Sequence, residues 1–429
     1  MSGPAVDDCF RHDERVLTHD EAIAMILARV PPIEGTERRP VEGGLARVLA
    51  EDVVAPRNVP MTDTSAVDGW AFAHADLIAA GGEMPVSGRI MAGRAAEEPL
   101  RRGTATRIFT GAAMPAGADT VAMQEDCRPA GDPPQHVVIP TGLRPGANRR
   151  RAGEDVATGT AVVGAGTVLR PQELAAIASL GVAAILVRRP LRIALLSTGD
   201  EILRPGAPIR PGEVYDANFV LLSSLTARPG FAVTDLGVLP DRRDDVFAAM
   251  AAAAASHDVV VTSGGTGHGE GDQVAAAIEA LGRRHLWQLA IKPGRPLSLG
   301  QIGDAITIGL PGNPVAALVS FLLYGEPLLA RRRGASWRPP VRYPLPAAFD
   351  MPARKTGRRE FLRGILVTGP DGRLAVDKYG RDGSGLISGL RAADGLIEIA
   401  EDVDAVREGE AVAFLPFTEF GLPQRQPGL

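Results

Sequence analysis

The segment spanning residues 258–272 constrains the fold and the chemistry of this chain more than any other part of the sequence. It opens with residues 259–262, Val-Val-Val-Thr, which are too few for a helix and are typical of a strand buried on both faces. Five glycines follow between Gly264 and Gly271, and a helical pattern covers residues 273–281. The sequence therefore predicts a strand, a glycine-rich turn and a helix start.

Such a turn presents backbone N–H groups to an anion, because glycine lets the backbone approach closely and the helix dipole favours negative charge. Glu270 and Asp272 lie in the same turn and would repel an anion unless a metal ion lay between them. We therefore expect a phosphate-bearing ligand bound with Mg²⁺. The plainer interpretation, a strand-to-helix connection with a flexible loop, does not account for the density of glycine and acid.

Length and composition indicate a soluble protein of about three domains. A net charge of −5 gives no support for nucleic-acid binding, and no apolar run reaches the length of a membrane span. Cys9 and Cys127 show neither a disulfide nor a metal-ligand spacing, and acidic residues from Asp7 onward interrupt any signal-peptide pattern. We therefore expect a reduced, cytoplasmic protein that binds no nucleic acid and no membrane.

Strands alternate with helices after Pro190, which predicts an α/β domain with a doubly wound, mostly parallel sheet over residues 189–333. Short strands separated by turns predict a small inserted β-domain over residues 61–147 and a C-terminal all-β domain over residues 341–418. Residues 15–60 and 148–188 are expected to form a discontinuous N-terminal linker domain, in which Thr18 and Glu21 form a capping box ahead of a helix over residues 22–27. The expected strands include residues 286–291 in the α/β domain and residues 368–373 and 389–395 in the C-terminal domain.

Ligands bind beyond the carboxyl ends of the strands in a doubly wound sheet. Four loops are expected there, formed by residues 198–201, 262–272, 292–296 and 310–314. Together these loops carry Asp200, Glu201, Glu270, Asp272, Lys292 and Arg295. The chain has only three lysines, Lys292, Lys355 and Lys378, so a lysine in such a loop suggests a need for a compact point charge.

Each loop taken alone also has a plainer interpretation. Residues 198–201 fit an Asx-type turn that caps a helix, and residues 310–314 fit a helix start with proline in the first turn. Lys292 fits a solvated charge, and a lone histidine such as His268 is more often an exposed or hydrogen-bonding residue than a ligand. The basic residues 149–151 fit a solvated run better than a phosphate clamp.

Six motifs, taken in order, resemble the molybdopterin molybdenumtransferase family, which includes the bacterial MoeA proteins and the E domain of gephyrin. The resemblance covers residues 15–417. The motifs are Ser-Ala-Val-Asp-Gly-Trp-Ala at 65–71, Thr-Gly to Ala-Asp at 110–119, Ala-Gly-Glu-Asp at 152–155, Ser-Thr-Gly-Asp-Glu at 197–201, Lys-Pro-Gly-Arg-Pro at 292–296 and Leu-Pro-Gly-Asn-Pro-Val at 310–315.

The resemblance implies insertion of molybdate into adenylylated molybdopterin, with release of AMP and a requirement for Mg²⁺. It also implies an elongated homodimer, with the site in a cleft between the α/β domain of one subunit and the second domain of its partner. Molybdopterin adenylyltransferase and molybdoenzyme maturation factors are further expected partners.

The resemblance also implies roles for individual residues. Asp68, Thr110 and Asp155 would come from the partner's side of the cleft, and Glu201, Asp241, Asp272 and Lys292 from the α/β domain. Glu201, Glu270 and Asp272 would hold the metal. The residues expected to bind the pterin substrate are Thr198, Gly199, Asp200, Ser263, Gly264, Gly265, Thr266, Gly267, Lys292, Arg295, Pro311 and Pro314.

The sequence departs from the family pattern at several positions. Ser-Gly-Gly-Thr-Gly at 263–267 is closer to the related molybdopterin adenylyltransferases, and Val67, Trp70 and Gln288 replace the usual Met, Tyr and Lys. Two alternatives follow from these changes. One is an adenylyltransferase or a divergent paralogue that acts on another molybdopterin form, and the other is a non-catalytic scaffold on the same fold.

Overall fold

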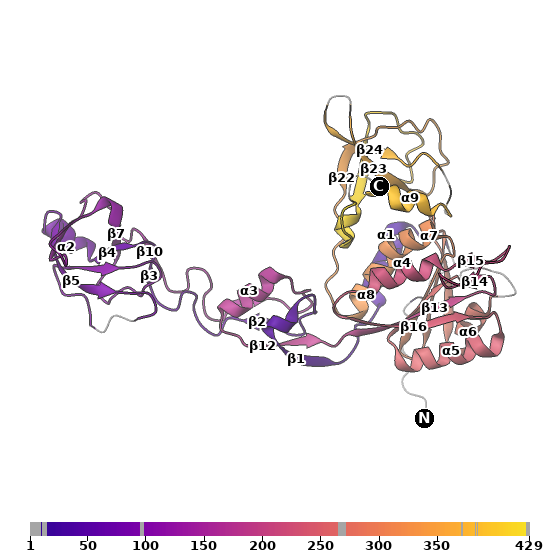
Figure 1. The fold of residues 1–429 in the computed structure, drawn as a ribbon, viewed down its shortest axis with the longest axis horizontal. Helices are drawn as coiled ribbons and strands as arrows, with labels where there is room; N and C mark the ends of the chain where they lie inside the picture. The colour runs from indigo at the N-terminus through magenta and orange to yellow at the C-terminus, as the bar shows by residue number, and fades with distance from the viewer. Residues whose placement is uncertain are drawn as a thin grey trace.

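The structure is a computed structural model that describes residues 10, 15–94, 98–264, 272–369, 372–381, 383 and 385–425. Figure 1 shows an elongated molecule with a small β-domain at one end and the α/β and C-terminal domains at the other. A narrow linker region joins the two ends. The small β-domain of a chain is therefore well separated from the α/β domain of the same chain.

The α/β domain is built on a six-stranded sheet whose strand order is β16-β13-β17-β21-β20-β18. The strands are β16 (Phe231–Leu239), β13 (Leu191–Thr198), β17 (Val259–Ser263), β21 (Ala305–Leu310), β20 (Pro296–Ile302) and β18 (Arg283–Gln288). The first four strands are parallel, and β20 is antiparallel to both of its neighbours. The expected mostly parallel sheet is confirmed.

Helices cover both faces of this sheet. They are α4 (Ala217–Thr226), α5 (Arg243–Ser256), α6 (Gln273–Leu281), α7 (Pro314–Ser320) and α8 (Glu326–Arg332), with a π-helical turn η3 (Phe321–Gly325) between the last two. The apolar residues of α5 and α6 share one core with Ala194, Leu196 and Val260, whereas α4, α7 and α8 share the other with Ile193, Leu195 and Val261. Alternate residues of a strand therefore enter opposite cores, which explains why β17 reads as a continuous apolar run.

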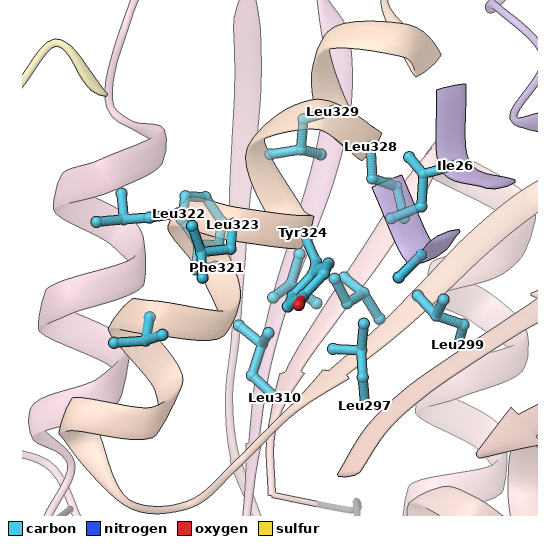
Figure 2. Packing of buried hydrophobic residues seen from close by; sticks show 14 of the residues in the cluster. Ile26, Leu297, Leu299, Leu310, Phe321, Leu322, Leu323, Tyr324, Leu328 and Leu329 are labelled. Atoms are coloured by element: carbon cyan, nitrogen blue, oxygen red, sulfur yellow. The ribbon is translucent and has the colours of Figure 1, made fainter. Parts of the chain in front are cut away.

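The second core contains the segment from α7 to α8, which is long and apolar enough to resemble a membrane span. Its most apolar window is 78% buried inside the protein. Figure 2 shows Tyr324 lying over Leu297 and Leu310 of the sheet, and Phe321, Leu322 and Leu323 belong to the same buried cluster. We therefore assign this segment to the core of the domain.

Helix α1 (His19–Arg29) begins at the capping box expected from Thr18 and Glu21, whose side chains each accept a hydrogen bond from the other's backbone N–H. Its buried residue Ile26 belongs to the core shared with α8, and the phenol of Tyr324 lies 3.0 Å from Nδ1 of His19. By packing, this first part of the 15–60 segment therefore joins the α/β domain. The domain limits as a whole remain a prediction.

Two distant segments build the linker region. Strand β1 (Thr36–Pro40) pairs with β12 (Ala184–Arg188), and β2 (Val53–Val54) pairs with β11 (Ala161–Val163). The 3₁₀ turn η1 (Val41–Gly44) and helix α3 (Pro171–Ser179) complete it. Its core includes Leu49, Leu169, Ile177, Ile185 and Val187.

The small β-domain has the strand order β7-β4-β6-β5-β9-β8. Its elements are β4 (Gly69–Phe72), helix α2 (His74–Ala79), β5 (Glu83–Ile90), β6 (Ala105–Ile108), β7 (Thr120–Met123), η2 (Gln124–Asp126), β8 (Arg128–Ala130) and β9 (His136–Val138). Two short paired strands, β3 (Thr64–Ser65) and β10 (Arg149–Arg150), lie where the chain enters and leaves this domain.

The C-terminal domain is strand-rich but also contains a helix. Its elements are β22 (Tyr343–Pro346), β23 (Arg359–Thr368), β24 (Leu374–Lys378), α9 (Ile387–Ala392), β25 (Gly395–Ile399), β26 (Ala411–Pro416) and η4 (Phe417–Phe420). The strands expected at 368–373 and 389–395 are wrong. Gly372, at φ +77°, turns the chain between β23 and β24, and most of the second range lies in α9.

The expected strand over residues 286–291 also needs correction. Strand β18 ends at Gln288, and Leu17 then accepts and donates hydrogen bonds with residues 288–290. The chain leaves the first sheet, and β19 (Ile291–Lys292) joins the sheet of the C-terminal domain beside β23. This long-range pairing ties the two domains together. A short parallel pair, β14 (Ile202–Leu203) and β15 (Val214–Tyr215), lies outside both sheets.

Candidate functional site

The carboxyl ends of three neighbouring parallel strands lie at one edge of the α/β sheet. Ser197 of β13 is in register with Ser263 of β17, and Ser263 is in register with Leu310 of β21. The loops that follow these residues therefore leave the sheet side by side. In an open sheet of this type, ligands bind at this edge.

Four carboxylates gather at this edge, from Asp200, Glu201, Asp241 and Asp272. Partial burial and the negative charges of the other three raise the pKa of Asp241 above its usual range. The backbone N–H of Asp241 also donates a hydrogen bond to the carboxylate of Asp200 at 3.3 Å. Carboxylates that repel one another in this way favour a bound cation, because a cation offsets their shared charge.

The local backbone leaves room for the carboxylate of Glu201 and holds that of Asp272 in place. Gly199 adopts φ +140°, and a Cβ at this position would lie 2.7 Å from Oε2 of Glu201. Only glycine therefore lets the Glu201 side chain fold back against the turn. Asp272 is the N-cap of α6 and accepts a hydrogen bond from the backbone N–H of Ala275 at 3.0 Å.

The chemistry of these donors fits Mg²⁺, which prefers carboxylate oxygens and keeps several waters or substrate phosphates in its shell. Within the described part of the chain, no three His, Cys, Asp or Glu side chains form a ready-made metal cluster. One or two carboxylates are enough for Mg²⁺ when phosphates supply the remaining ligands. Glu201 and Asp272 are therefore suitable residues for such a shared site.

Asn218, on α4, is a residue of this edge that sequence reasoning missed. Its buried amide Nδ2 donates hydrogen bonds to Oγ of Ser263 and to the backbone carbonyl of Gly312, both at 2.7 Å. It therefore links the end of β17 to the loop after β21. A lone Asn near the start of a helix gives little signal in the sequence, since it commonly serves as a cap.

A cavity of about 520 Å³ lies beside this edge, between the α/β and C-terminal domains. Lys292 at the end of β19 and Arg295 in the turn that follows line it, and Pro311 lines it from the loop after β21. Pro314 begins α7 next to this wall, between the lining residues Asn313 and Val315. The structure thus brings together residues from two of the expected loops.

The C-terminal domain supplies the other wall, which the sequence did not predict. Arg358, Arg363, Lys378 and Tyr379 line the cavity, together with the carboxylate of Glu360. Two of the three lysines of the chain therefore face one cavity. The scarcity of lysine was the one sequence signal that pointed to Lys378.

Asp68 and Thr110 lie together at the far end of the molecule, on the small β-domain. Asp68 accepts hydrogen bonds from the Thr110 backbone N–H at 2.8 Å and from its hydroxyl at 2.7 Å. These two bonds hold the pKa of Asp68 below its usual range. Asp155 is also exposed in this half of the molecule, where its N–H donates to the carbonyl of Val59. Figure 1 places the small β-domain well away from the carboxylate edge of the same chain.

Four expected binding residues lie outside the described residues, namely Gly265, Thr266, Gly267 and Glu270, and so does His268. Gly264 is described and adopts φ +101°. Its backbone N–H donates to the carbonyl of Leu310 at 2.8 Å, so the glycine loop starts against β21.

A larger cavity of about 720 Å³ lies at the opposite edge of the sheet. Asp258 lies there, and Arg189 and Arg192 both bind its carboxylate. Burial raises the pKa of Asp258, but the hydrogen bonds from the two arginines outweigh this effect and hold the pKa well below its usual range. Since these charges satisfy one another, we place the reactive site at the carboxyl edge.

The comparisons with known proteins cover nearly the whole chain. The MoeA N-terminal region (domains I and II) matches residues 17–181, the probable molybdopterin binding domain matches residues 194–331, and the MoeA C-terminal region (domain IV) matches residues 344–417. The molybdopterin molybdenumtransferase of Haemophilus influenzae is 36% identical over 403 residues, which are 94% of this chain and 99% of that protein. The chain belongs to the molybdopterin molybdenumtransferase family.

Other members of the family agree with this assignment. Molybdopterin molybdenumtransferase 2 of Mycobacterium tuberculosis is 34% identical over 92% of this chain and 97% of its own length. The structure of the molybdopterin biosynthesis MoeA protein from Pyrococcus horikoshii superposes with a TM-score of 0.79 at 28% identity, over 94% of this chain and 100% of that chain. As a family member, the chain is a transferase of molybdenum cofactor biosynthesis.

Proposed function

We propose that this transferase inserts molybdate into adenylylated molybdopterin and releases AMP in a Mg²⁺-dependent reaction. The observation that carries this proposal is the arrangement of charge at one sheet edge. Four carboxylates lie beyond the ends of the parallel strands, and a cavity with five cationic side chains lies beside them. A diphosphate ester needs carboxylates that hold a metal ion, and an oxyanion needs cationic side chains. A reaction between the two needs both sets of side chains close together.

The cationic cavity supports the binding of an oxyanion such as molybdate or a pterin phosphate. Lys292, Arg295, Arg358, Arg363 and Lys378 line it, and Glu360 is the one carboxylate among its described lining residues. Arginine and lysine offset the charge of an oxyanion and donate hydrogen bonds to its oxygens. Molybdate would enter here as a substrate.

The carboxylate edge supports the cleavage of the adenylyl diphosphate. Glu201 and Asp272 would hold Mg²⁺, together with Glu270 of the glycine loop, and the bound ion would neutralise the diphosphate as AMP leaves. Asp200 and Asp241 would keep the local charge negative and so favour the cation. The fixed position of Asp272, which caps α6, supports this assignment, since metal binding needs fixed donors.

The distance between the two ends of the molecule supports a site shared between two copies. In this elongated arrangement the small β-domain, whose strands β4 and β6 adjoin Asp68 and Thr110, lies well away from the α/β domain of its own chain. Asp155 follows β10, where the chain leaves the small β-domain. We therefore propose a homodimer in which these residues complete the site of the partner subunit. Asp68 would meet the substrate as an anion, because Thr110 stabilises its charged form.

The proposal is tested by incubating the purified chain with adenylyl-molybdopterin, molybdate and Mg²⁺ and measuring AMP by chromatography. We expect AMP release that depends on molybdate and on Mg²⁺. Turnover only with ATP and unmodified molybdopterin would indicate an adenylyltransferase instead. An absence of any turnover by the folded protein would indicate a non-catalytic scaffold.

A further inference from the structure

Lys292 and Glu360 belong to different domains but lie directly opposite each other. They are Cα partners in the parallel pairing of β19 with β23, and Nζ of Lys292 lies 2.5 Å from Oε1 of Glu360. Both residues line the cationic cavity. A residue of the C-terminal domain therefore holds the ammonium of Lys292 at the wall of the cationic cavity.

The two cations that bind Glu360 differ in their freedom to move. Arg354 is only 5% exposed, lies 3.4 Å from the second oxygen of Glu360, and also donates to the carbonyl of Ala400 at 2.6 Å. Lys292 is 57% exposed, whereas Glu360 is 9% exposed. If Lys292 moves away, Glu360 therefore still has Arg354 to balance its charge.

Glu360 is also the one negative charge among the described residues that line this cavity. An entering oxyanion is attracted by the surrounding cations and repelled by Glu360 at short range. It must also compete with Glu360 for the ammonium of Lys292. The carboxylate thus opposes the binding of the ligand that the cavity otherwise favours.

We propose that Glu360 is a positioning residue that acts as a built-in competitor of the oxyanion. Before the oxyanion binds, Glu360 orients the Lys292 ammonium. When the oxyanion binds, the Lys292 ammonium leaves Glu360 and pairs with the oxyanion. Arg354 then remains as the counter-charge of Glu360. Glu360 thereby weakens the binding of all dianions, molybdate and sulfate alike. This inference rests on the proposed function, which makes the cavity the oxyanion site.

The inference is tested by equilibrium dialysis of the full-length protein against sodium molybdate and, separately, sodium sulfate. We expect Glu360→Gln to bind both dianions roughly tenfold more tightly than the unmodified chain, since it removes one nearby negative charge. In a Lys292→Met background, Glu360→Gln is expected to increase dianion affinity by a smaller factor. A merely structural role of Glu360 would not tighten binding.

Glu398→Gln is a matched control. Glu398 is equally buried, lies on the adjacent strand β25 and is paired with Arg342 and Arg359, but it does not line the cavity. We expect it to leave dianion affinity unchanged.

Because the chain has only three lysines, Cε of Lys292 is resolvable by lysine-selective ¹³C labelling, and its resonance is expected to shift on addition of molybdate.

The outcomes separate this inference from the proposed function. Equal or weaker dianion binding by folded Glu360→Gln, beside measurable binding by the unmodified chain, overturns the inference alone. Binding by Glu360→Gln with none by the unmodified chain supports it. A failure of both proteins to bind molybdate overturns the inference and the oxyanion cavity together.

Discussion

The carboxylate of Asp272 accepts a hydrogen bond from the backbone N–H of Ala275 at 3.0 Å and so caps helix α6 at the edge of the proposed metal site. Its negative charge also contributes to the raised pKa of Asp241. One side chain thus has a structural role and a charge role, and substitutions can separate them.

Asp272→Asn keeps the cap but removes the charge, because Asn and Asp cap helices about equally well. We expect AMP release to fall on the order of a hundredfold or more, with an unchanged melting temperature. Asp272→Ala should lose both the helix cap and the charge, and its free energy of unfolding should fall by about 1 kcal/mol as well. Unimpaired AMP release by Asp272→Asn would contradict the role assigned to the carboxylate edge.

Asn218→Ala removes two hydrogen bonds at once, those to Ser263 and to Gly312. Because Gly312 is exposed and its carbonyl can bind water instead, we expect a loss of about 1 kcal/mol of stability for each hydrogen bond. We also expect weaker substrate binding, because the end of β17 and the loop after β21 lose their link. Thermal melts and the KM for the adenylylated substrate measure the two effects. A change in stability with no change in KM would limit Asn218 to a structural role.

Thr110→Val removes the hydroxyl that donates to Asp68 but leaves the backbone N–H bond in place. The pKa of Asp68 should then rise toward its ordinary value, since the hydroxyl stabilises the charged form. We expect kcat to fall by roughly tenfold or more, while Thr110→Ser should retain most activity. Equal rates for the two variants would show that the hydroxyl has no role in the reaction.

His19 makes the fold sensitive to acid. Burial, followed by the positive charge of Arg359, lowers the pKa of His19 to about 4 from an ordinary value of 6.5. The unfolded chain therefore binds a proton more readily between pH 6.5 and pH 4. Stability should be fully present above pH 6.5 and fall as the pH drops through this window, by up to roughly 3 kcal/mol.

His19→Gln cannot take up this proton and should lose less stability across the same window. Thermal melts of both proteins at pH 7, 6, 5 and 4.5 measure the difference. The variant is expected to be less stable at pH 7, because the contact with the phenol of Tyr324 changes. Parallel pH profiles for the two proteins would contradict the assignment to His19.

Local patterns in the sequence were sufficient to predict the central part of the α/β domain. The apolar run before Gly264 and the helical pattern from Gln273 correspond to β17 and α6, because both elements are determined by neighbouring residues. The capping box at Thr18 was visible for the same reason. The carboxylates at the sheet edge followed from strand order, which brings the loop ends together.

Contacts between distant residues were not predictable in this way. Ile291 leaves one sheet for another because it pairs with Arg359, and no local pattern marks that exchange. Arg358, Arg363 and Lys378 enter the cavity for the same reason, since they belong to a separate domain. The helix α9 was mistaken for a strand in a glycine-rich segment with weak periodicity.

The most direct test of the account is complementation between two inactive variants, Asp68→Asn and Asp272→Asn, measured as AMP release after the two are mixed and allowed to exchange subunits. A mixed dimer carries both substitutions in one site and neither in the other, if each site takes Asp272 from one chain and Asp68 from its partner. We expect each variant alone to be inactive and the mixture to recover AMP release. No recovery in a mixture shown by mass spectrometry to contain mixed dimers would contradict a site shared between two copies.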